Sequence, residues 1–554
     1  MNQPDNSREP ISALELGGLA VIVVIGAILR ILFMLQAPGF FYDEAIYALD
    51  GLRVLRDPGW PIFFDTLNHM REPLFIYLLA ATQGLFGVSV EVARGTATLV
   101  GVLTIPVVWA LAREWRGPAF ALFAAFLFAT LRWHVHFSGL CFRTITSPLL
   151  ASLVVLFFMR LVRTRSWRDA ICFGAALGVG AYTYLSFRLF PFIVLPAIVA
   201  ACLPGWRWDA AMAKRFAASV GVAALIFLPL GVHFARHPDH FTGRSDEVSI
   251  FSQPGLILKQ ARDVALMGIV RGDHVGKHNL PGPPRFLQLV EPKPEETAEL
   301  WDLERAFAQS NGTPAPDPHG TGVPVFFLLS GLFFYAGCVA VSIRAWRSSP
   351  DLLLISWLVV GSLASVLSFG APNMLRLLYL SPAAVLLLTE GFRLAAAGFS
   401  ALASRIGAAA DPPRAATWIG QLLIVGVLGP LVLLHVLVET ERARQWPTHP
   451  MVPVEFNTDL AGLGEYLRSQ PDRQPARLPE VFATHPTLLY VADGLVINPP
   501  VEALGRRWWE FEPALGMAVP APVPGARPVP SGRTYEMRLP GGVLVGRLVE
   551  LERD

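Results

Sequence analysis

The chain has 554 residues, of which 53% are hydrophobic and only 16% are charged, and its mean hydropathy is +0.47. Soluble globular proteins carry about 25% charged residues, so this composition excludes an ordinary soluble protein and predicts an integral membrane protein. The formal net charge of +2 argues against nucleic acid as a partner. The four cysteines lie in or beside apolar stretches, which indicates neither a disulfide framework nor a metal cluster.

A helix that crosses the bilayer needs about 20 apolar residues, and eleven stretches of the chain fit this requirement. The predicted spans are residues 12–35, 94–112, 118–137, 143–161, 168–186, 189–204, 214–233, 324–343, 352–369, 376–396 and 417–438. The first span is not followed by a small-residue cleavage site, so we expect it to stay in the protein.

One more apolar run, residues 74–87, has only 14 residues and ends at a glycine. If it lies outside the membrane, most arginines between the spans fall on one face, as the positive-inside rule requires. If it crosses the membrane, the arginine cluster at 160–168 moves to the opposite face. We therefore expect residues 74–87 to form an interfacial helix.

Three larger pieces of chain then share the outer face, namely residues 37–93, 234–323 and 446–554. The last piece has a helix-like stretch at 457–469 and strand-like stretches at 478–484, 487–493 and 541–551. Residues 520–530 are rich in proline, which indicates an extended linker. The sequence therefore predicts a transmembrane domain over residues 1–445 and a small extracytoplasmic α/β domain over residues 446–554.

Two adjacent acids, Asp43 and Glu44, directly follow the first predicted span and are surrounded by aromatic residues that include Tyr47. Acidic side chains at a membrane boundary tend to be paired or functional. One interpretation is that Asp43 caps a short helix over residues 44–56. The other is that Asp43 is a general base that faces a substrate held in the membrane.

Several stretches follow this acidic pair in a specific order. They are an R-x-P-L sequence at 71–74, an arginine at the start of the next span, RWHVHFSGLCFRTITSPLLASL at 132–153, RHPDHFTGRSDEVSIF at 236–251, GDHVGKHNLPGPP at 272–284 and APNMLRLLYLSPA at 371–383. In this order the chain resembles the GT-C membrane glycosyltransferases over residues 12–440. The most similar group is glycosyltransferase family 39 with its bacterial relatives, which include protein O-mannosyltransferases and aminoarabinose lipid A transferases.

The resemblance implies an α-helical polytopic fold of about 11 transmembrane helices with the active site on the outer leaflet. It also implies a sugar donor linked to polyprenyl phosphate and inversion at the anomeric carbon. In such enzymes the aspartate of the first outer loop is the base on the acceptor hydroxyl. That aspartate corresponds to Asp43, and Glu44 beside it would orient Asp43 or the sugar.

Four arginines lie at the outer ends of predicted helices and are candidates for binding the donor phosphate, because a guanidinium can hold a phosphate by two hydrogen bonds. They are Arg71, Arg143, Arg188 and Arg376. Each could instead be an interfacial charge that extends toward water. We prefer Arg143 and Arg376, because little other charge is nearby. Glu72 could position Arg71, contact a sugar hydroxyl or neutralise Arg71, and Tyr47 is a further substrate-binding candidate.

The glycine- and proline-rich stretch that contains His274, His278 and Asn279 favours contact with sugar or phosphate, or a loop held by side-chain bonds. A metal pair at His-x3-His spacing needs a helix, which Gly276 and Pro281 disfavour. Some relatives carry a second acid near position 147 that helps to bind a divalent ion, whereas this chain has Ser147 there. A divalent cation (Mg²⁺ or Mn²⁺) is therefore an open possibility, and Arg143 could serve as the cation instead.

The sequence thus predicts an inverting glycosyltransferase of the bacterial inner membrane, with its C-terminal domain on the extracytoplasmic side. Its partners would be a polyprenyl-phosphate sugar donor, membrane lipid and an acceptor that is a protein, a lipid or a glycan. The alternatives are a polytopic transporter and a protein that only binds lipid-linked sugar. A transporter is disfavoured, because internal repeats and ionisable residues in the middle of the membrane are not evident.

Overall fold

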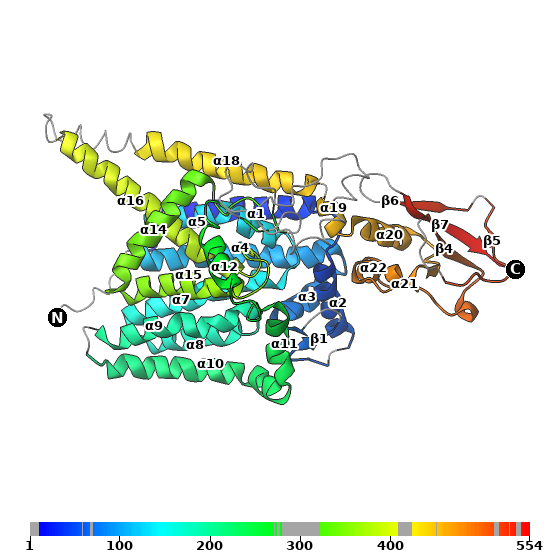
Figure 1. Ribbon diagram of the computed structural model, residues 1–554, viewed down its shortest axis with the longest axis horizontal. Coiled ribbons are helices and arrows are strands. Elements are labelled where there is room, and N and C mark those ends of the chain that lie inside the picture. Colours follow the sequence, from blue (N-terminus) through cyan, green and yellow to red (C-terminus); the bar gives the residue numbers. More distant parts are fainter. Residues whose placement is uncertain are drawn as a thin grey trace.

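The structure is a computed structural model that describes residues 10–553 except 58, 67–69, 205–206, 271, 274–277, 280–321, 408–423, 450, 515–519, 531 and 539–543. A bundle of long helices forms most of the molecule, and a smaller C-terminal region of helices and strands extends from one end of the bundle (Figure 1). The helices before the first long gap are α1 (Ala13–Gln36), α2 (Tyr42–Arg56), α3 (Leu74–Phe86), α4 (Val90–Arg116), α5 (Pro118–Thr130), α6 (Arg132–Ser138), α7 (Thr146–Thr164), α8 (Trp167–Gly180), α9 (Phe190–Cys202), α10 (Ala210–Arg236), α11 (Pro238–Val248) and α12 (Leu256–Ala265). After the gap follow α14 (Leu328–Ala345), α15 (Ser349–Val366), α16 (Ser381–Gly407) and α18 (Gly429–Gln445).

Short helical turns extend several of these helices at their starts. They are η1 (Arg143–Ile145), η2 (Leu185–Leu189), η6 (Leu378–Leu380) and the π-helical η7 (Ile424–Leu428). Residues between α2 and α3 form a small antiparallel hairpin of β1 (Phe64–Asp65) and β2 (Met70–Arg71), in which Phe64 pairs with Arg71.

Within the described residues, eight helices are long and apolar enough to cross a membrane, and the bent pair α5–α6 makes a ninth if it counts as one span. The eleven predicted spans also included α8 and the η7–α18 stretch. The α8 helix has 14 residues and α18 has 17, and neither is among the eight helices. Part of the predicted span 417–438 lies outside the described residues.

Helix α8 ends six residues earlier than predicted, because the chain turns closely at Gly180. A Cβ atom at Gly180 would lie 2.0 Å from the Phe187 ring. This close contact brings η2 against the end of α8, and the chain enters α9 through η2. The turn also places Tyr184 and Arg188 at this end of the bundle.

The run predicted to lie outside the membrane forms α3, which has 13 residues and packs against α2. Both helices lie at the end of the bundle nearest the C-terminal region (Figure 1). The predicted inner arginines gather at the other end. Arg113, in the last turn of α4, pairs at 2.8 Å with Glu15 in the first turn of α1.

The C-terminal region, residues 446–553, combines short helices with one mixed sheet. Its helices are η8 (Trp446–Thr448), α19 (Met451–Glu455), α20 (Thr458–Ser469), α21 (Glu480–Ala483), α22 (Pro486–Val491) and η9 (Val501–Ala503). Its strands are β3 (Ala476–Arg477), β4 (Arg507–Pro513), β5 (Arg527–Pro528), β6 (Thr534–Arg538) and β7 (Leu544–Glu552). The strand order is β3-β4-β7-β5, with β6 also paired to β7, and only the β3–β4 pair is parallel.

The predictions for this region were partly wrong. Helix α20 and strand β7 agree with the predicted helix at 457–469 and the predicted strand at 541–551. The predicted strands at 478–484 and 487–493 are instead the short helices α21 and α22. Both helices start at or directly after a proline, Pro479 and Pro486, and a short apolar run cannot by itself distinguish a strand from a buried helix. Part of the predicted linker pairs in the sheet as β5.

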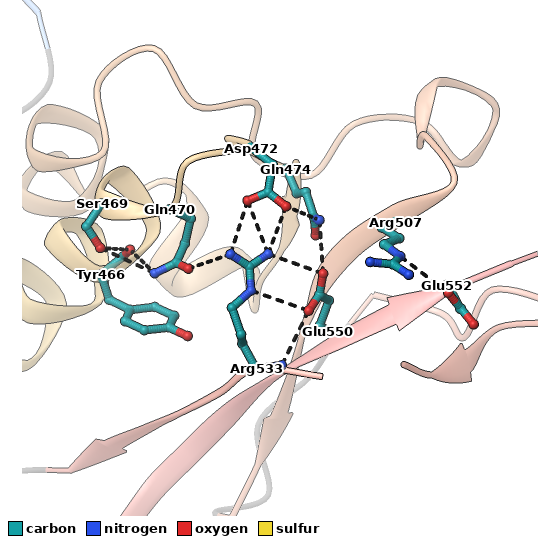
Figure 2. Close-up of polar contacts among 9 residues, drawn as sticks. All are labelled: Tyr466, Ser469, Gln470, Asp472, Gln474, Arg507, Arg533, Glu550 and Glu552. Carbon is teal, nitrogen blue, oxygen red and sulfur yellow. Dashed lines mark hydrogen bonds and ion pairs between the residues drawn. The ribbon is translucent and has the colours of Figure 1, made fainter. Parts of the chain in front are cut away.

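The C-terminal region has an apolar core of its own between α20 and the sheet, which includes Leu463, Trp509 and Leu548. A network of polar contacts around Arg533 joins the end of α20 to β7 (Figure 2). By contrast, Phe456 and Tyr490 are buried with the core of the helical bundle. The region therefore folds around its own core and presents a second buried face to the bundle.

Candidate active site

Five residues separate the end of the first span from helix α2, which carries Asp43 in its first turn. The N-cap residue of α2 is Phe41, so the interpretation of Asp43 as the helix cap is wrong. Asp43 is half-buried, whereas Tyr47, one turn further along the same face, is buried. Burial raises the pKa of the Tyr47 phenol, and the negative charge of Asp43 raises it further. Tyr47 therefore remains protonated at neutral pH and its hydroxyl can donate a hydrogen bond.

The Glu44 carboxylate points into the protein and holds the start of α2 in place. It accepts hydrogen bonds from the backbone nitrogens of Phe41 at 3.0 Å and Cys141 at 2.7 Å. It also accepts two hydrogen bonds from Arg94, at 3.0 Å and 2.9 Å. Arg94 in turn donates to the carbonyl oxygens of residues 37–39. Glu44 is fully buried, so its position suits it to orient Asp43 rather than to contact a sugar.

Arg71 lies on the hairpin beside α2 and is bound to Asp50, which is fully buried. The Arg71 Nε–Asp50 Oδ2 distance is 3.0 Å, and Thr66 donates to the same carboxylate at 2.8 Å. The Arg71 guanidinium lies 5.7 Å from the centre of the Tyr47 ring. Burial lowers the pKa of Arg71, and the negative charge of Asp50 opposes this shift. Arg71 therefore stays charged.

Glu72 is shared by two of the predicted arginines and does not pair with Arg71. Its Oε2 atom accepts a hydrogen bond from Arg143, and its Oε1 atom lies 3.1 Å from Nη2 of Arg188. The Arg188 guanidinium also packs over the rings of Phe234 and Phe241, at 5.0 Å and 4.6 Å from their centres. One buried carboxylate thus gathers two cations.

Arg143 is buried, with only 5% of the residue exposed. Its Nε atom is buried and has no hydrogen-bond partner within the described part of the chain. The guanidinium lies 5.8 Å from the centre of the Tyr47 ring and 4.9 Å from that of Tyr184. A buried donor without a partner costs about 1–3 kcal/mol, so this atom is a natural contact for an anionic ligand.

Arg376 approaches the same site from the loop before α16. Its Nη1 atom donates to the Ser368 hydroxyl at 2.7 Å and to the Phe369 carbonyl at 2.6 Å. Burial lowers the pKa of Arg376, while the charges of Tyr184 and Asp273 oppose this shift. Tyr184 thus interacts electrostatically with Arg376 and also lies beside Arg143.

His278 and Asn279 are held by the protein itself. The Nδ1 atom of His278 lies 2.9 Å from Oδ2 of Asp273, which also accepts a hydrogen bond of 2.6 Å from the backbone nitrogen of Met374. The Oδ1 atom of Asn279 accepts from Arg132 at 3.0 Å. These contacts agree with a loop held by side-chain bonds. His274 lies outside the described residues.

An apolar cavity of about 480 Å³ lies next to the Arg376 loop, between α12, α14, α15 and α16. Its walls include Trp133, Val264, Phe326, Phe334, Leu363 and Leu377. Trp133 donates to the carbonyl oxygen of Met374 at 2.9 Å, and Leu377 directly follows Arg376. The cavity therefore shares its boundary with the loop that carries a phosphate-binding candidate.

Sequence reasoning missed Asp50, Tyr184 and the role of Arg94. Asp43, Tyr47 and Asp50 have the i, i+4, i+7 spacing of one helix face, so the polar face of α2 could have indicated Asp50. Tyr184 and Arg94 act through contacts between distant parts of the chain, and the spacing of residues gives no signal for those.

The described residues offer no cluster of metal ligands. Within the described residues, no group of three or more His, Cys, Asp or Glu side chains is arranged to hold a metal ion. The charged groups around Asp43 and Tyr47 are mainly arginines, which are not metal ligands. Ser147 is buried and donates to the hydroxyl of Thr183 at 3.2 Å.

Comparison with known proteins gives a match in sequence and a match in fold. Residues 70–233 match the family described as dolichyl-phosphate-mannose-protein mannosyltransferase. This range contains Arg71, Glu72, Arg143 and Arg188. No curated protein matches the sequence.

Two solved structures share the fold at low sequence identity. ArnT from Cupriavidus metallidurans bound to undecaprenyl phosphate is 14% identical, with a TM-score of 0.51 and 98% of each chain covered. The Archaeoglobus fulgidus oligosaccharyltransferase tethered with an acceptor peptide is 16% identical, with a TM-score of 0.50, and the match covers 83% of this chain and 58% of the other. This chain is similar to the GT-C glycosyltransferases. The predicted resemblance and the predicted fold class, a polytopic helical membrane protein with a small C-terminal α/β part, are confirmed.

Proposed function

We propose that this protein is an inverting glycosyltransferase that takes a sugar from a polyprenyl-phosphate donor and passes it to an acceptor outside the cytoplasm. The observation that carries the proposal is that Tyr47 lies close both to the half-buried Asp43 and to a buried arginine cluster, with Arg71 and Arg143 over its ring. In that cluster, the Nε atom of Arg143 has no hydrogen-bond partner within the described residues. A carboxylate and an anion-binding group at one site are the two parts that such a transfer needs.

In the proposed reaction, Asp43 takes the proton of the acceptor hydroxyl as its oxygen attacks the anomeric carbon. The bond between that carbon and the phosphate oxygen breaks on the opposite side, and polyprenyl phosphate leaves as an anion. Arg143 and Arg376 bind the phosphate, with Arg71 and Arg188 adding positive charge nearby. A phosphate is already a stable anion, so the leaving group needs cations more than it needs an acid.

Tyr47 lies one turn after the proposed base on α2, and the guanidinium groups of Arg71 and Arg143 lie over its ring. Its protonated hydroxyl is suited to donate a hydrogen bond to an oxygen of the donor. Glu72 holds Arg143 and Arg188 together, and Glu44 fixes the first turn of α2 so that Asp43 keeps its orientation.

The polyprenyl tail occupies the apolar cavity beside the Arg376 loop. The cavity walls are almost entirely apolar, and burying hydrocarbon there is favourable by about 25 cal/mol for each Å² removed from water. Leu377 lines the cavity and directly follows Arg376, which supports a lipid tail in the cavity with its phosphate toward the Arg376 loop.

We also propose that the transmembrane domain ends near residue 445 and that residues 446–554 form an extracytoplasmic domain of a bacterial inner-membrane protein. The separate apolar core of the C-terminal region supports this division. The arginines at the end of the bundle opposite Asp43 support the orientation, because such clusters favour the cytoplasmic side. The acceptor is a protein, lipid or glycan hydroxyl.

The test is sugar transfer from radiolabelled polyprenyl-phosphate sugars in proteoliposomes, with wild type compared with Asp43→Asn. We expect the variant to lose turnover by at least about a hundredfold while it still binds donor lipid. Transfer by wild type should persist with a chelator. Loss of transfer in the chelator would show that a divalent ion takes part.

Glu91→Gln is the matched control, because Glu91 is an exposed acid in the first turn of the neighbouring helix α4. It should retain wild-type turnover. Full activity in Asp43→Asn would rule out Asp43 as the base. A folded wild-type protein that binds donor lipid but transfers no sugar would instead favour a protein that only binds lipid-linked sugar, and movement of the lipid across the bilayer would favour a transporter.

A further inference from the structure

The short segment between the first span and Asp43 is held directly by the C-terminal region. The backbone nitrogen of Phe40 donates to the carbonyl oxygen of Phe456 at 2.7 Å. Gly39 has a φ of +46°, and a Cβ atom there would lie 2.1 Å from the same carbonyl oxygen. The two backbones can approach this closely only because residue 39 is glycine.

Helix α22 makes the second contact with this segment. The Thr487 hydroxyl donates to the carbonyl oxygen of Phe40 at 2.9 Å, and the Thr487 side chain is fully buried. One turn further, the Tyr490 ring stacks on Phe40 with 5.2 Å between ring centres, and its hydroxyl donates to Ser89 at 2.9 Å. Phe40 is fully buried by these contacts.

The other end of α2 is bound to the same part of the C-terminal region. Arg56, in the last turn of α2, donates to both carboxylate oxygens of Asp493 at 2.8 Å and 2.7 Å. Asp493 lies two residues after the end of α22. The helix that carries Asp43 is therefore held at its first turn and at its last turn by α22 and the residues around it.

We propose that the C-terminal region positions the base Asp43, and that Thr487 is the positioning residue through its hydrogen bond to Phe40. The inference rests on the proposed function, because it assigns a purpose to the orientation of Asp43. Phe40 precedes Asp43 by three residues, and a shift of its carbonyl changes the direction in which the first turn of α2 begins. A displacement of about 1 Å at a reacting group can cost about a hundredfold in rate.

The contribution of Thr487 is partial, because the same segment is also held from the bundle. Arg94 donates to the carbonyl oxygen of Gly39 at 2.9 Å and lies over the Phe40 ring at 5.6 Å. The bundle therefore fixes one side of the segment and the C-terminal region fixes the other. Loss of the Thr487 hydroxyl should loosen the segment without releasing it.

The experiment compares Thr487→Val and Thr487→Ser in the full-length protein in proteoliposomes. Thr487→Val keeps the shape of the side chain and removes the hydroxyl, so we expect kcat to fall about tenfold while the donor KM changes less than about twofold. Thr487→Ser keeps the hydroxyl and should restore kcat. Thr484→Val is the control, because the exposed Thr484 hydroxyl bonds only within α21, to Glu480 at 2.8 Å.

A double-mutant cycle separates positioning of Asp43 from general damage. In an Asp43→Asn background, Thr487→Val should cause no further loss of the residual transfer, because the group that it positions is gone. An equal loss in both backgrounds, or no rescue by Thr487→Ser, would overturn the inference. If Asp43→Asn itself leaves transfer unchanged, the proposed function of Asp43 fails instead.

Arg56→Gln gives a second measurement that does not risk the fold, because the Arg56 side chain is 58% exposed. It removes the contact at the far end of α2, and we expect kcat to fall about two- to fivefold with an unchanged melting temperature. Wild-type kcat in both Arg56→Gln and Thr487→Val would show that the C-terminal region does not position Asp43.

Discussion

Two charge clusters of this protein have opposite arrangements. Near Asp43, the buried carboxylate of Glu72 is shared by Arg143 and Arg188. In the C-terminal region, Arg533 is shared by Asp472 and Glu550. The first cluster therefore gathers cations around one acid, and the second gathers acids around one cation (Figure 2).

The two clusters also differ in whether every nitrogen of the arginine side chain has a hydrogen-bond partner. Every nitrogen of the Arg533 guanidinium has a partner: Nε donates to Glu550 at 3.4 Å, Nη1 to Gln470 at 2.8 Å and Nη2 to Asp472 at 2.9 Å. In the first cluster, Nε of Arg143 is buried without a partner in the described structure. A cluster in which each group has a partner is suited to hold the fold together, whereas the unpaired donor of Arg143 agrees with the phosphate-binding role that we propose for it.

Among the variants that compare the two clusters, Arg143→Met has the largest expected effect. The variant removes the spare donor but leaves Glu72 paired with Arg188, so the fold should survive. We expect the donor KM to rise at least about tenfold, because a charge-assisted hydrogen bond contributes about 1.5–3 kcal/mol. Donor titrations in proteoliposomes measure this.

Arg163→Met is the control for that variant. Arg163 lies near the other end of the same helix, α7, where it pairs with Glu114 at 2.6 Å. It should leave the donor KM unchanged. An unchanged KM in Arg143→Met as well would remove the difference that we draw between the two clusters.

A smaller effect is expected for Tyr47→Phe. The ring remains beside Arg71 and Arg143, and only the hydroxyl is lost, so we expect kcat to fall about tenfold with little change in stability. Tyr77→Phe is the control, because the Tyr77 hydroxyl donates at 2.8 Å to Pro61, away from the cluster. Equal kcat values for the two variants would show that the Tyr47 hydroxyl takes no part in transfer.

The smallest effect on activity is expected for Arg533→Met, which should keep the rate of sugar transfer within about twofold of wild type. The variant should lower the free energy of unfolding by about 1 kcal/mol, which is the upper end of the range for a partly exposed ion pair. The hydrogen bonds from Arg533 lower the pKa of Asp472. For Glu550, burial acts to raise the pKa, but the hydrogen bonds from Arg533 and Gln474 outweigh it and the pKa is lowered.

Because both pKa values are lower in the folded state, the stabilisation is complete above the unfolded values of about 4 and is lost as the pH falls through the folded values. Thermal unfolding of the two proteins should therefore differ at pH 7 and converge as the pH falls below the folded pKa values of the two acids. A difference in stability that stays constant with pH would show that packing of Arg533 on Trp509, at 5.2 Å, outweighs its charge.

How far the sequence predicts each region depends on where the stabilising contacts come from. The spans were predicted well because a long apolar run can only be satisfied in lipid or in a core. Helices α21 and α22 were predicted as strands, because their short apolar runs take the form that the neighbouring chain imposes. The arginines were predicted as a group, but their partners were not. For Glu72, the sequence left open a role beside Arg71 or a contact with a sugar hydroxyl, and in the structure it binds Arg143, 71 residues away.

The sequence by itself determined the class of the protein, the approximate spans, and the place of Asp43 directly after the first span. Hydropathy and charge act locally and can be followed along the chain. Only the tertiary structure decided that Glu44 binds Arg94, 50 residues away, and that Thr487 binds Phe40 across 447 residues. Such pairs depend on the geometry of packed helices, in which one side chain can reach only the few groups that the fold brings within about 3 Å.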